Sequence, residues 1–205
     1  MTARYVAVLA GPAVATPPGT DPAEFRLAVL EDTYEVVAGL EFVTPVLALT
    51  ENGESGENSE FDKDAEAITW PGTEVVRTTG LGALLDALTG LGAEQAAVIA
   101  HDAPDLPPLL VGKLFRALGG GEVAICPAKG GGLVALAARL PAPAWLAGID
   151  LDTTDAPSRL RAAAGRPGAV RSGPGWHRLR TPADLARLDP GLEGWDNTRI
   201  LLAGG

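Results

Sequence analysis

Short apolar segments alternate with helix-like segments along most of the chain, and this alternation limits the available folds more than any other feature. The expected strands cover residues 4–10, 43–50, 74–77, 96–100, 123–126, 133–136 and 169–171. The expected helices cover residues 23–38, 81–91, 108–118, 143–147, 156–164 and 181–188. Strands that alternate with helices are typical of an α/β sandwich around a mainly parallel sheet. We predict this fold class, in a single domain spanning residues 1–205.

Two helix starts carry clear local signals. Asp21 precedes Pro22, which suits an N-cap followed by the first helical position. Thr181 precedes Pro182, and Asp184 stands at the third helical position, which is typical of a capping box. These signals predict where two helices begin, whereas the last residues, 189–205, are left as a tail without an assigned element.

Length and composition exclude several classes of protein. A chain of 205 residues suits one domain with a sizeable core. Its longest apolar runs, such as residues 96–100, are far shorter than the ~20 residues that a membrane span needs. The first residues have neither the long apolar core nor the small-residue cleavage site of a signal peptide. A lone cysteine, Cys126, excludes an internal disulfide framework and a cysteine-based zinc site. We therefore expect a cytoplasmic protein that does not associate with membranes.

The net charge of −10 is unevenly distributed. Residues 51–66 carry seven acidic side chains and one lysine, a pattern that predicts an exposed acidic loop. Residues 158–187 carry seven arginines and one aspartate. Because an acidic surface repels phosphate backbones, we expect no nucleic-acid partner. A small-molecule partner and a homo-oligomer both remain open.

Several strands are followed by residues that suit a ligand site. Loops begin at Gly11, His101 and Lys129, and ligands of open α/β sheets bind at the carboxyl ends of the strands. Asp102 lies just past a buried strand, where a carboxylate could ligate Mg²⁺ beside a diphosphate. The alternative is that Asp102 or Asp105 only caps the next helix.

Six short motifs occur in a characteristic order: Asp32-Thr33, Gly80-Leu81-Gly82, residues 102–106, residues 127–133, Gly148-Ile149-Asp150 and residues 181–185. Over about residues 4–188 the chain resembles the small bacterial glycosyltransferase-like family (DUF2064 type) related to the molybdenum-cofactor and phospholactate guanylyltransferases. The resemblance implies a nucleotide-diphospho-sugar transferase fold (GT-A), which is a Rossmann-like three-layer α/β/α sandwich. It also implies a nucleotide or nucleotide-sugar ligand and Mg²⁺ or Mn²⁺.

The departures from this family all concern phosphate and metal binding. The family's basic loop, ending in Lys-Thr-Arg-Leu, corresponds to residues 11–22, which contain no Lys or Arg. Its Asp-Gly-Gly-Tyr corresponds to residues 130–133, which lack the acid and the aromatic residue. Its Asp-x-Asp-Thr-Pro corresponds to residues 178–182, so Arg180 stands in place of an acid. Asp102 is left as a lone carboxylate, and a nearby guanidinium repels a divalent cation. Mg²⁺ or Mn²⁺ would bind Asp102 weakly, if at all, and we expect the transfer activity to be lost or altered.

These considerations define a candidate cleft formed by Ala10, Gly11, Asp102, Gly131, Gly132, Arg178 and Arg180. In an active enzyme, Asp102 would bind the ion or orient the diphosphate, and the backbone at Gly11 would hold the base. Arg171, Arg178 and Arg180 could replace the metal, because arginine binds phosphate bidentately and stays charged. The alternative is that these arginines form salt bridges with a neighbouring acid such as Asp102.

Three further alternatives stay open. The chain could be a catalytically silent scaffold that acts as a protein-interaction or regulatory module, because the fold alone does not fix function. His101 and His177 could form a transition-metal or general-base site, or they could only hydrogen-bond to the backbone. Trp176 could stack on a base or pack internally, whereas Cys126 is expected to be a buried small hydrophobic residue.

Overall fold

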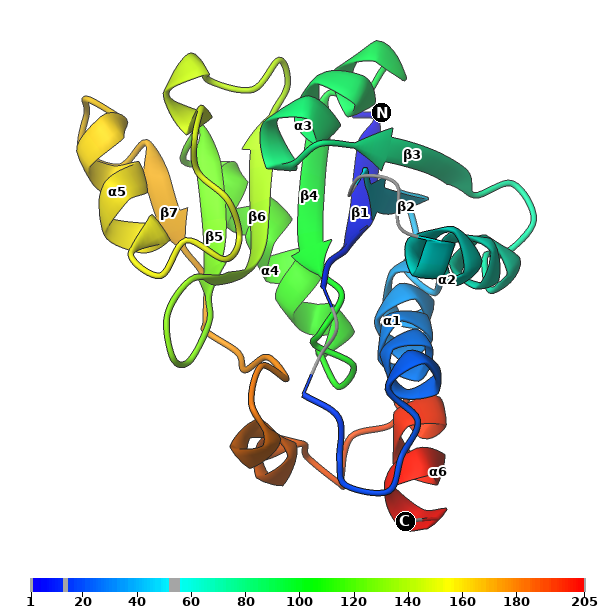
Figure 1. Cartoon of the computed structure of the whole chain (residues 1–205). Coiled ribbons are helices and arrows are strands. Elements are labelled where there is room, and N and C mark those ends of the chain that lie inside the picture. The colour runs from blue at the N-terminus through cyan, green and yellow to red at the C-terminus, as the bar shows by residue number, and fades with distance from the viewer. Residues whose placement is uncertain (1, 13–14, 52–55, 205) are drawn as a thin grey trace.

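The computed structural model describes residues 2–12, 15–51 and 56–204. Within these residues, seven strands form one sheet in the order β3-β2-β1-β4-β6-β5-β7 (Figure 1). The strands are β1 (Arg4–Ala10), β2 (Thr44–Thr50), β3 (Glu74–Thr78), β4 (Gln95–Ala100), β5 (Val123–Pro127), β6 (Leu133–Arg139) and β7 (Val170–Ser172). Strand β6 runs antiparallel to β4 and β5, and every other neighbouring pair is parallel. The predicted mixed, mainly parallel sheet is confirmed.

Helices cover both faces of this sheet. They are α1 (Pro22–Ala38), α2 (Gly56–Ala67), α3 (Leu81–Gly90), α4 (Pro108–Leu118), α5 (Ala156–Ala163) and α6 (Asp196–Gly204), with 3₁₀ turns at Ala144–Leu146 and Pro182–Arg187. Residues of α1, α2 and α4 share one apolar core with one face of the sheet. Residues of α3 and α5 share a second core with the opposite face. The result is a three-layer α/β/α sandwich.

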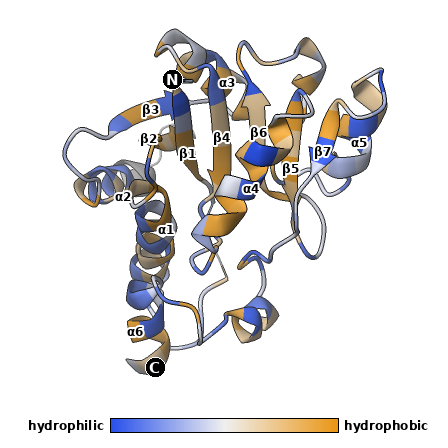
Figure 2. Cartoon of the chain, turned by 180° about the vertical axis from the view of Figure 1, so that it is seen from behind, coloured by the Kyte–Doolittle hydropathy of each residue, from blue (hydrophilic) through white to orange (hydrophobic). Residues whose placement is uncertain are grey.

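The central strands are apolar along their whole length because both of their faces are covered. Every residue of β4 is buried. Alternate residues of β1 divide between the two cores: Val6 and Val8 belong to the α1/α4 side, and Ala7 and Leu9 belong to the α3/α5 side. Figure 2 shows the hydrophobic colouring of the middle of the sheet. This packing fixes the strand ends that carry the candidate site.

The local signals at the helix starts are reproduced. The Asp21 side chain accepts hydrogen bonds from the backbone N–H groups of Ala23 and Glu24, both at 2.9 Å. Thr181 and Asp184 form a capping box, but residues 182–187 form a 3₁₀ helix and not the expected α-helix. The tail that had no assigned element contains α6.

The expectation of an acidic loop over residues 51–66 is wrong for most of that segment. Residues 56–67 form α2, and Phe61 and Ala65 are buried against the sheet and α1. These two positions are four residues apart and lie on one face of a helix, which gives the acidic segment a narrow apolar stripe. Residues 52–55, and residues 13–14 of the loop after β1, lie outside the described residues.

Helix α6 is attached to α1 through a buried carboxylate. Asp32 accepts hydrogen bonds from the backbone N–H groups of Asn197 (3.1 Å) and Thr198 (2.8 Å), at the start of α6. Burial raises the pKa of Asp32, and these hydrogen bonds oppose that shift. Leu179 belongs to the apolar cluster between α1 and α6. The C-terminal helix therefore helps to hold the segment around Leu179.

Within the described residues, no helix is both long and apolar enough to cross a bilayer.

Candidate functional site

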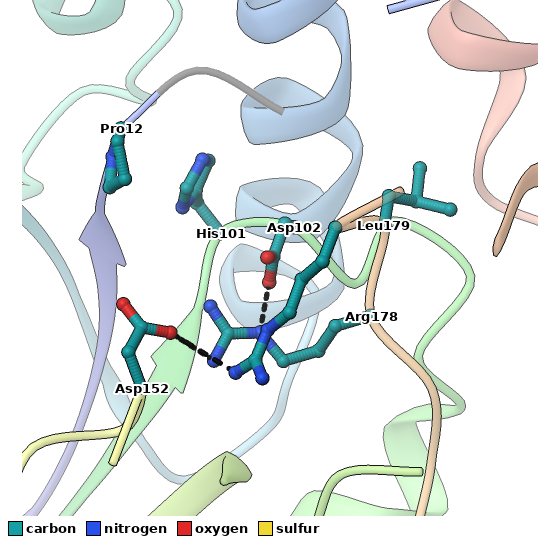
Figure 3. A pocket seen from close by; sticks show the side chains of 7 residues that line it. Pro12, His101, Asp102, Asp152, Arg178 and Leu179 are labelled. Atoms are coloured by element: carbon teal, nitrogen blue, oxygen red, sulfur yellow. Dashed lines mark hydrogen bonds and ion pairs between the residues drawn. The ribbon is translucent and has the colours of Figure 1, made fainter. Parts of the chain in front are cut away.

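Two adjoining cavities open at the carboxyl ends of β1 and β4. The larger, of about 300 Å³, is lined by Pro12, His101, Asp102, Asp152, Arg178, Leu179 and Arg180 (Figure 3). The smaller, of about 180 Å³, shares Pro12, His101, Asp152 and Arg178 with it and extends to Ala10, Gly11, Thr50, Glu51, Gly80 and Asp150. We call these two cavities together the cleft. Its position is the edge at which ligands of open α/β sheets bind.

Four charged side chains form a continuous network in the cleft, which we call the charge network: Asp102, Asp152, Arg178 and Arg180. Arg178 donates from Nε to Oδ1 of Asp102, and its Nη1 lies 2.7 Å from Oδ1 of Asp152 (Figure 3). Arg180 Nη2 donates to the same Asp152 oxygen at 3.1 Å. The alternative that the arginines pair with neighbouring acids is therefore confirmed, with Asp102 as the partner of Arg178.

Burial differs sharply within the charge network. The side chains of Arg178 and Asp102 are only 6% and 5% exposed, whereas the Asp152 side chain is 58% exposed. Arg180 is intermediate, and its pKa is lowered first by burial and second by the neighbouring positive charge of Arg178. The network thus has a buried inner pair and an outer part that faces the solvent.

Leu179 sets the direction of both arginines. It is fully buried in the apolar cluster between α1 and α6, and its backbone N–H donates to the Asp102 carbonyl at 2.8 Å. Side chains on either side of a residue in extended backbone point away from it. Arg178 and Arg180 therefore both line the cleft, for which the sequence analysis named them as candidates.

His101 lines both cavities. Its Nδ1 accepts a hydrogen bond from the Gly11 backbone N–H at 3.0 Å. A neutral imidazole that accepts at Nδ1 carries its proton on Nε2, and burial lowers the pKa of His101, which favours this neutral form. Nε2 is buried and has no hydrogen-bond partner among the described residues. A Cβ at Gly11 would lie 2.9 Å from His101 Cε1, so this contact requires glycine.

The residues of the cleft do not fit a divalent metal ion. Asp102, the expected ligand, already has Oδ1 occupied by Arg178. In the part of the chain that the structure describes, no group of three or more His, Cys, Asp or Glu side chains could hold a metal ion. The two guanidinium groups of Arg178 and Arg180 would also repel a dication.

The glycines of the candidate set lie behind Arg180. Gly131 and Gly132 belong to the turn that joins β5 to β6, and the Gly131 carbonyl accepts a hydrogen bond from Arg180 Nη1 at 2.9 Å. A Cβ at Gly132 would lie 2.6 Å from the Leu151 carbonyl oxygen and 3.0 Å from Arg180 Nη2. Gly132 therefore leaves room for Arg180 to approach the backbone, whereas a Cβ at Gly131 would lie 2.8 Å from Thr154 Cγ2.

Asp105 is the centre of a second buried polar group, the Asp105 hub, which consists of Asp105, Trp176, His177 and Asp189. Asp105 accepts hydrogen bonds from Trp176 Nε1 (3.0 Å) and the Asp189 backbone N–H (3.1 Å), and it lies 3.0 Å from His177 Nε2. His177 is therefore engaged apart from His101, and the two histidines do not form the joint metal or base site considered above. Trp176 stacks on His177 with ring centroids 4.8 Å apart.

Three other expectations are resolved by the structure. Arg171 is not in the cleft, because its Nε donates to the Gly120 carbonyl at 3.1 Å, beyond the end of α4. Neither Asp102 nor Asp105 caps α4, whose N-cap is Pro107 without a side-chain hydrogen bond. Cys126 is buried, as predicted, and burial raises the pKa of its thiol to about 11.

Asp152 is the functional candidate that sequence analysis missed. It stands two residues after the Gly148-Ile149-Asp150 motif, in a segment with three aspartates, so nothing local distinguishes it. Its role is visible only from its contacts with Arg178 and Arg180, which are 26 and 28 residues away along the chain.

Comparison with known proteins is consistent with this architecture. The family model described as "Uncharacterized protein conserved in bacteria (DUF2064)" matches residues 33–153. No curated protein matches the sequence.

Solved structures match nearly the whole chain. A protein from Desulfovibrio desulfuricans G20, named as a proposed nucleotide-diphospho-sugar transferase, has a TM-score of 0.68 at 17% identity, covering 99% of this chain and 96% of that one. Rv0371c from Mycobacterium tuberculosis H37Rv, in complex with manganese, has a TM-score of 0.59 at 20% identity, covering 94% and 100%. CMP:2-keto-3-deoxy-manno-octonic acid synthetase in complex with CTP has a TM-score of 0.59 at 13% identity, covering 99% of each chain. The predicted nucleotide-diphospho-sugar transferase fold is confirmed.

Proposed function

The chain belongs to the bacterial DUF2064 family, and from this premise we propose that it binds a nucleotide, a nucleotide sugar or another phosphorylated small molecule in the cleft. We further propose that it is a divergent glycosyl- or nucleotidyltransferase-like protein whose metal-dependent transfer activity is lost or altered. The observation that carries the proposal is the position of Arg178. Its guanidinium lies against Asp102, where a metal-dependent enzyme would need a free carboxylate.

The charges of the cleft support a phosphate ligand without a metal. Arg178 supplies a buried positive charge, and Arg180 supplies a second one at the solvent-facing side. Arginine binds phosphate through two parallel N–H groups and remains charged at any pH of interest. Asp102 and Asp152 balance these two charges in the free protein, so the guanidiniums neutralise a phosphate group only if it takes the place of one of these carboxylates.

The opposite side of the cleft suits the rest of a nucleotide. Gly11, Thr50 and Gly80 line the smaller cavity next to His101, although the Gly11 N–H already donates to His101 and the Thr50 hydroxyl already donates to the Ala10 carbonyl. His101 Nε2 carries the proton and has no partner among the described residues, but it is buried, so it would donate to a ligand oxygen only after the side chains that cover it move. A structural neighbour in complex with CTP supports nucleotide binding by this fold. Another neighbour is in complex with manganese, whereas the cleft of this chain does not fit a divalent metal ion.

The test is thermal unfolding with nucleoside mono-, di- and triphosphates and nucleotide sugars, each with Mg²⁺, with Mn²⁺ and with EDTA. A ligand at 100 times its dissociation constant should stabilise the fold by about 2.7 kcal/mol. We expect a shift in the unfolding midpoint that is the same in EDTA as in Mg²⁺. A shift that requires the metal would contradict the proposal.

Arg180→Ala should weaken the affinity for such a ligand by about tenfold, because it removes a charged donor to phosphate. Arg166→Ala is the matched control, since Arg166 is also an exposed arginine paired with an acid, Glu122, but lies outside the cleft. Calorimetric titration of both variants measures the difference. If no ligand shifts the unfolding of the wild-type protein, the silent scaffold becomes the better account.

A further inference from the structure

One carboxylate oxygen in the cleft is shared by two arginines. Oδ1 of Asp152 lies 2.7 Å from Arg178 Nη1 and 3.1 Å from Arg180 Nη2. A phosphate oxygen bound between the two guanidiniums would need the same position and the same donors. Asp152 thus occupies the place of an anionic ligand.

Asp102 and Asp152, the two acids of the charge network, differ in their contribution to the stability of the fold. Asp102 is buried beside Arg178, so it compensates a charge that the interior could not otherwise hold. Asp152 is 58% exposed, and exposed ion pairs contribute little to stability. Losing the contact with Asp152 would leave Arg178 still paired with Asp102.

Displacing Asp152 requires little movement of the backbone. The preceding residue, Leu151, is buried, and its carbonyl accepts a hydrogen bond from the Leu133 N–H at 2.8 Å. Two residues after Asp152, the Thr154 carbonyl accepts from the Gly132 N–H at 2.9 Å. The segment is therefore attached to the start of β6 on both sides of Asp152, while the exposed side chain is free to rotate into solvent.

We propose that Asp152 is an internal anion that a phosphate or pyrophosphate group of the ligand displaces from between Arg178 and Arg180. This inference rests on the proposed function, because it identifies the part of the cleft that receives the phosphorylated group. The competing carboxylate lowers the affinity for every anion, and a singly charged ion that makes one contact gains too little to replace it. A ligand with several phosphate oxygens replaces both contacts of Asp152 and gains more.

The test is isothermal titration calorimetry in EDTA, in which inorganic phosphate and pyrophosphate are titrated into the wild-type protein and into Asp152→Asn. Removal of the competing charge should raise the affinity for pyrophosphate about three- to tenfold, on the scale of two exposed ion pairs. Asp155→Asn is the control, because Asp155 is an exposed aspartate three residues away that does not line the cleft. It removes the same charge and should change the affinity by less than about twofold, as expected for a screened, exposed charge. The double variant Asp152→Asn/Arg180→Ala should lose the gain.

Three outcomes would overturn the inference: an affinity of Asp152→Asn equal to that of Asp155→Asn, an affinity lower than wild type, or a gain that persists without Arg180. Asp152→Ser provides a second variant, and thermal unfolding verifies that each variant is folded. If the wild-type protein binds nucleotides but Asp152→Asn shows no gain, this inference fails and the proposed function stands. If Asp152→Asn gains affinity for pyrophosphate while no nucleotide or nucleotide sugar binds, the inference stands and the nucleotide part of the proposed function fails.

Discussion

The Asp105 hub and the charge network draw most of their residues from the same two segments, residues 101–106 and residues 176–180, to which the hub adds Asp189 and the network adds Asp152, yet they have opposite characters. In the hub, a fully enclosed carboxylate accepts hydrogen bonds from a tryptophan, a histidine and a backbone N–H. In the charge network, the acids and arginines range from buried to mostly exposed. The two segments therefore contribute both to a buried polar group, the Asp105 hub, and to a partly exposed site, the charge network.

The difference shows how this fold positions a site without making it rigid throughout. The hub fixes Trp176 and His177, and Leu179 is fixed by the apolar cluster with α1 and α6. Arg178 and Arg180 are thereby held at their backbones, while the side chain of Arg180 remains partly exposed. The backbones of Arg178 and Arg180 are thus fixed, whereas the Arg180 and Asp152 side chains are partly exposed. This combination suits a site in which a ligand replaces Asp152 between the two arginines.

The largest expected effect comes from the inner pair of the charge network. Arg178→Met should lower the free energy of unfolding by about 3–5 kcal/mol, because it leaves the buried Asp102 without its countercharge. Urea denaturation followed by circular dichroism measures this loss.

The double variant Asp102→Asn/Arg178→Met is the control, since it removes both charges and should recover part of the stability. If Arg178→Met is as stable as the wild type, the inner pair is not coupled, and the distinction between an inner and an outer part of the network is lost.

A smaller loss is expected in the hub. Asp105→Asn should lower the free energy of unfolding by about 2 kcal/mol, because an amide replaces a charged acceptor and presents an N–H group to existing donors. The same urea denaturation measures it, and phosphate titration of the folded variant should give an affinity close to that of the wild type. An unchanged stability with weakened phosphate binding would reverse the roles assigned to the two regions.

Local patterns in the sequence predicted most of the fold. The strand and helix positions follow from short apolar runs and from caps such as Asp21, whose effects act within a few residues. Helix α2 was missed because the acidic residues of 51–66 outweighed the two apolar positions Phe61 and Ala65. Those positions acquire meaning only once α1 and the sheet are present to bury them.

The site was less predictable because its partners are distant in sequence. The cleft position and the alternatives for Arg178 could be stated in advance, since they depend on strand ends and on residue type. The choice of Asp102 as partner, 76 residues from Arg178, depends on how β4 meets the segment after β7. Asp152 could not be chosen among neighbouring aspartates, because its distinction lies entirely in the two arginines it contacts.

The smallest expected effect concerns His101, which begins the same turn that carries Asp102 and Asp105. Burial lowers its pKa, so below about pH 6.5 the unfolded chain binds a proton that the folded protein does not. The free energy of unfolding should therefore fall as the pH decreases from about 7, by at most about 1.4 kcal/mol per pH unit. His101→Asn should lose this dependence, because its side-chain oxygen can accept the Gly11 N–H and does not titrate. Urea denaturation of both proteins from pH 8 to pH 5 isolates the difference, since all other titrating groups are shared.

Equal pH dependence of the two proteins would mean that His101 is protonated in the folded protein at no cost in free energy. In that case the neutral imidazole with a proton on Nε2 would have to be abandoned, and with it the hydrogen-bond donor assigned to His101.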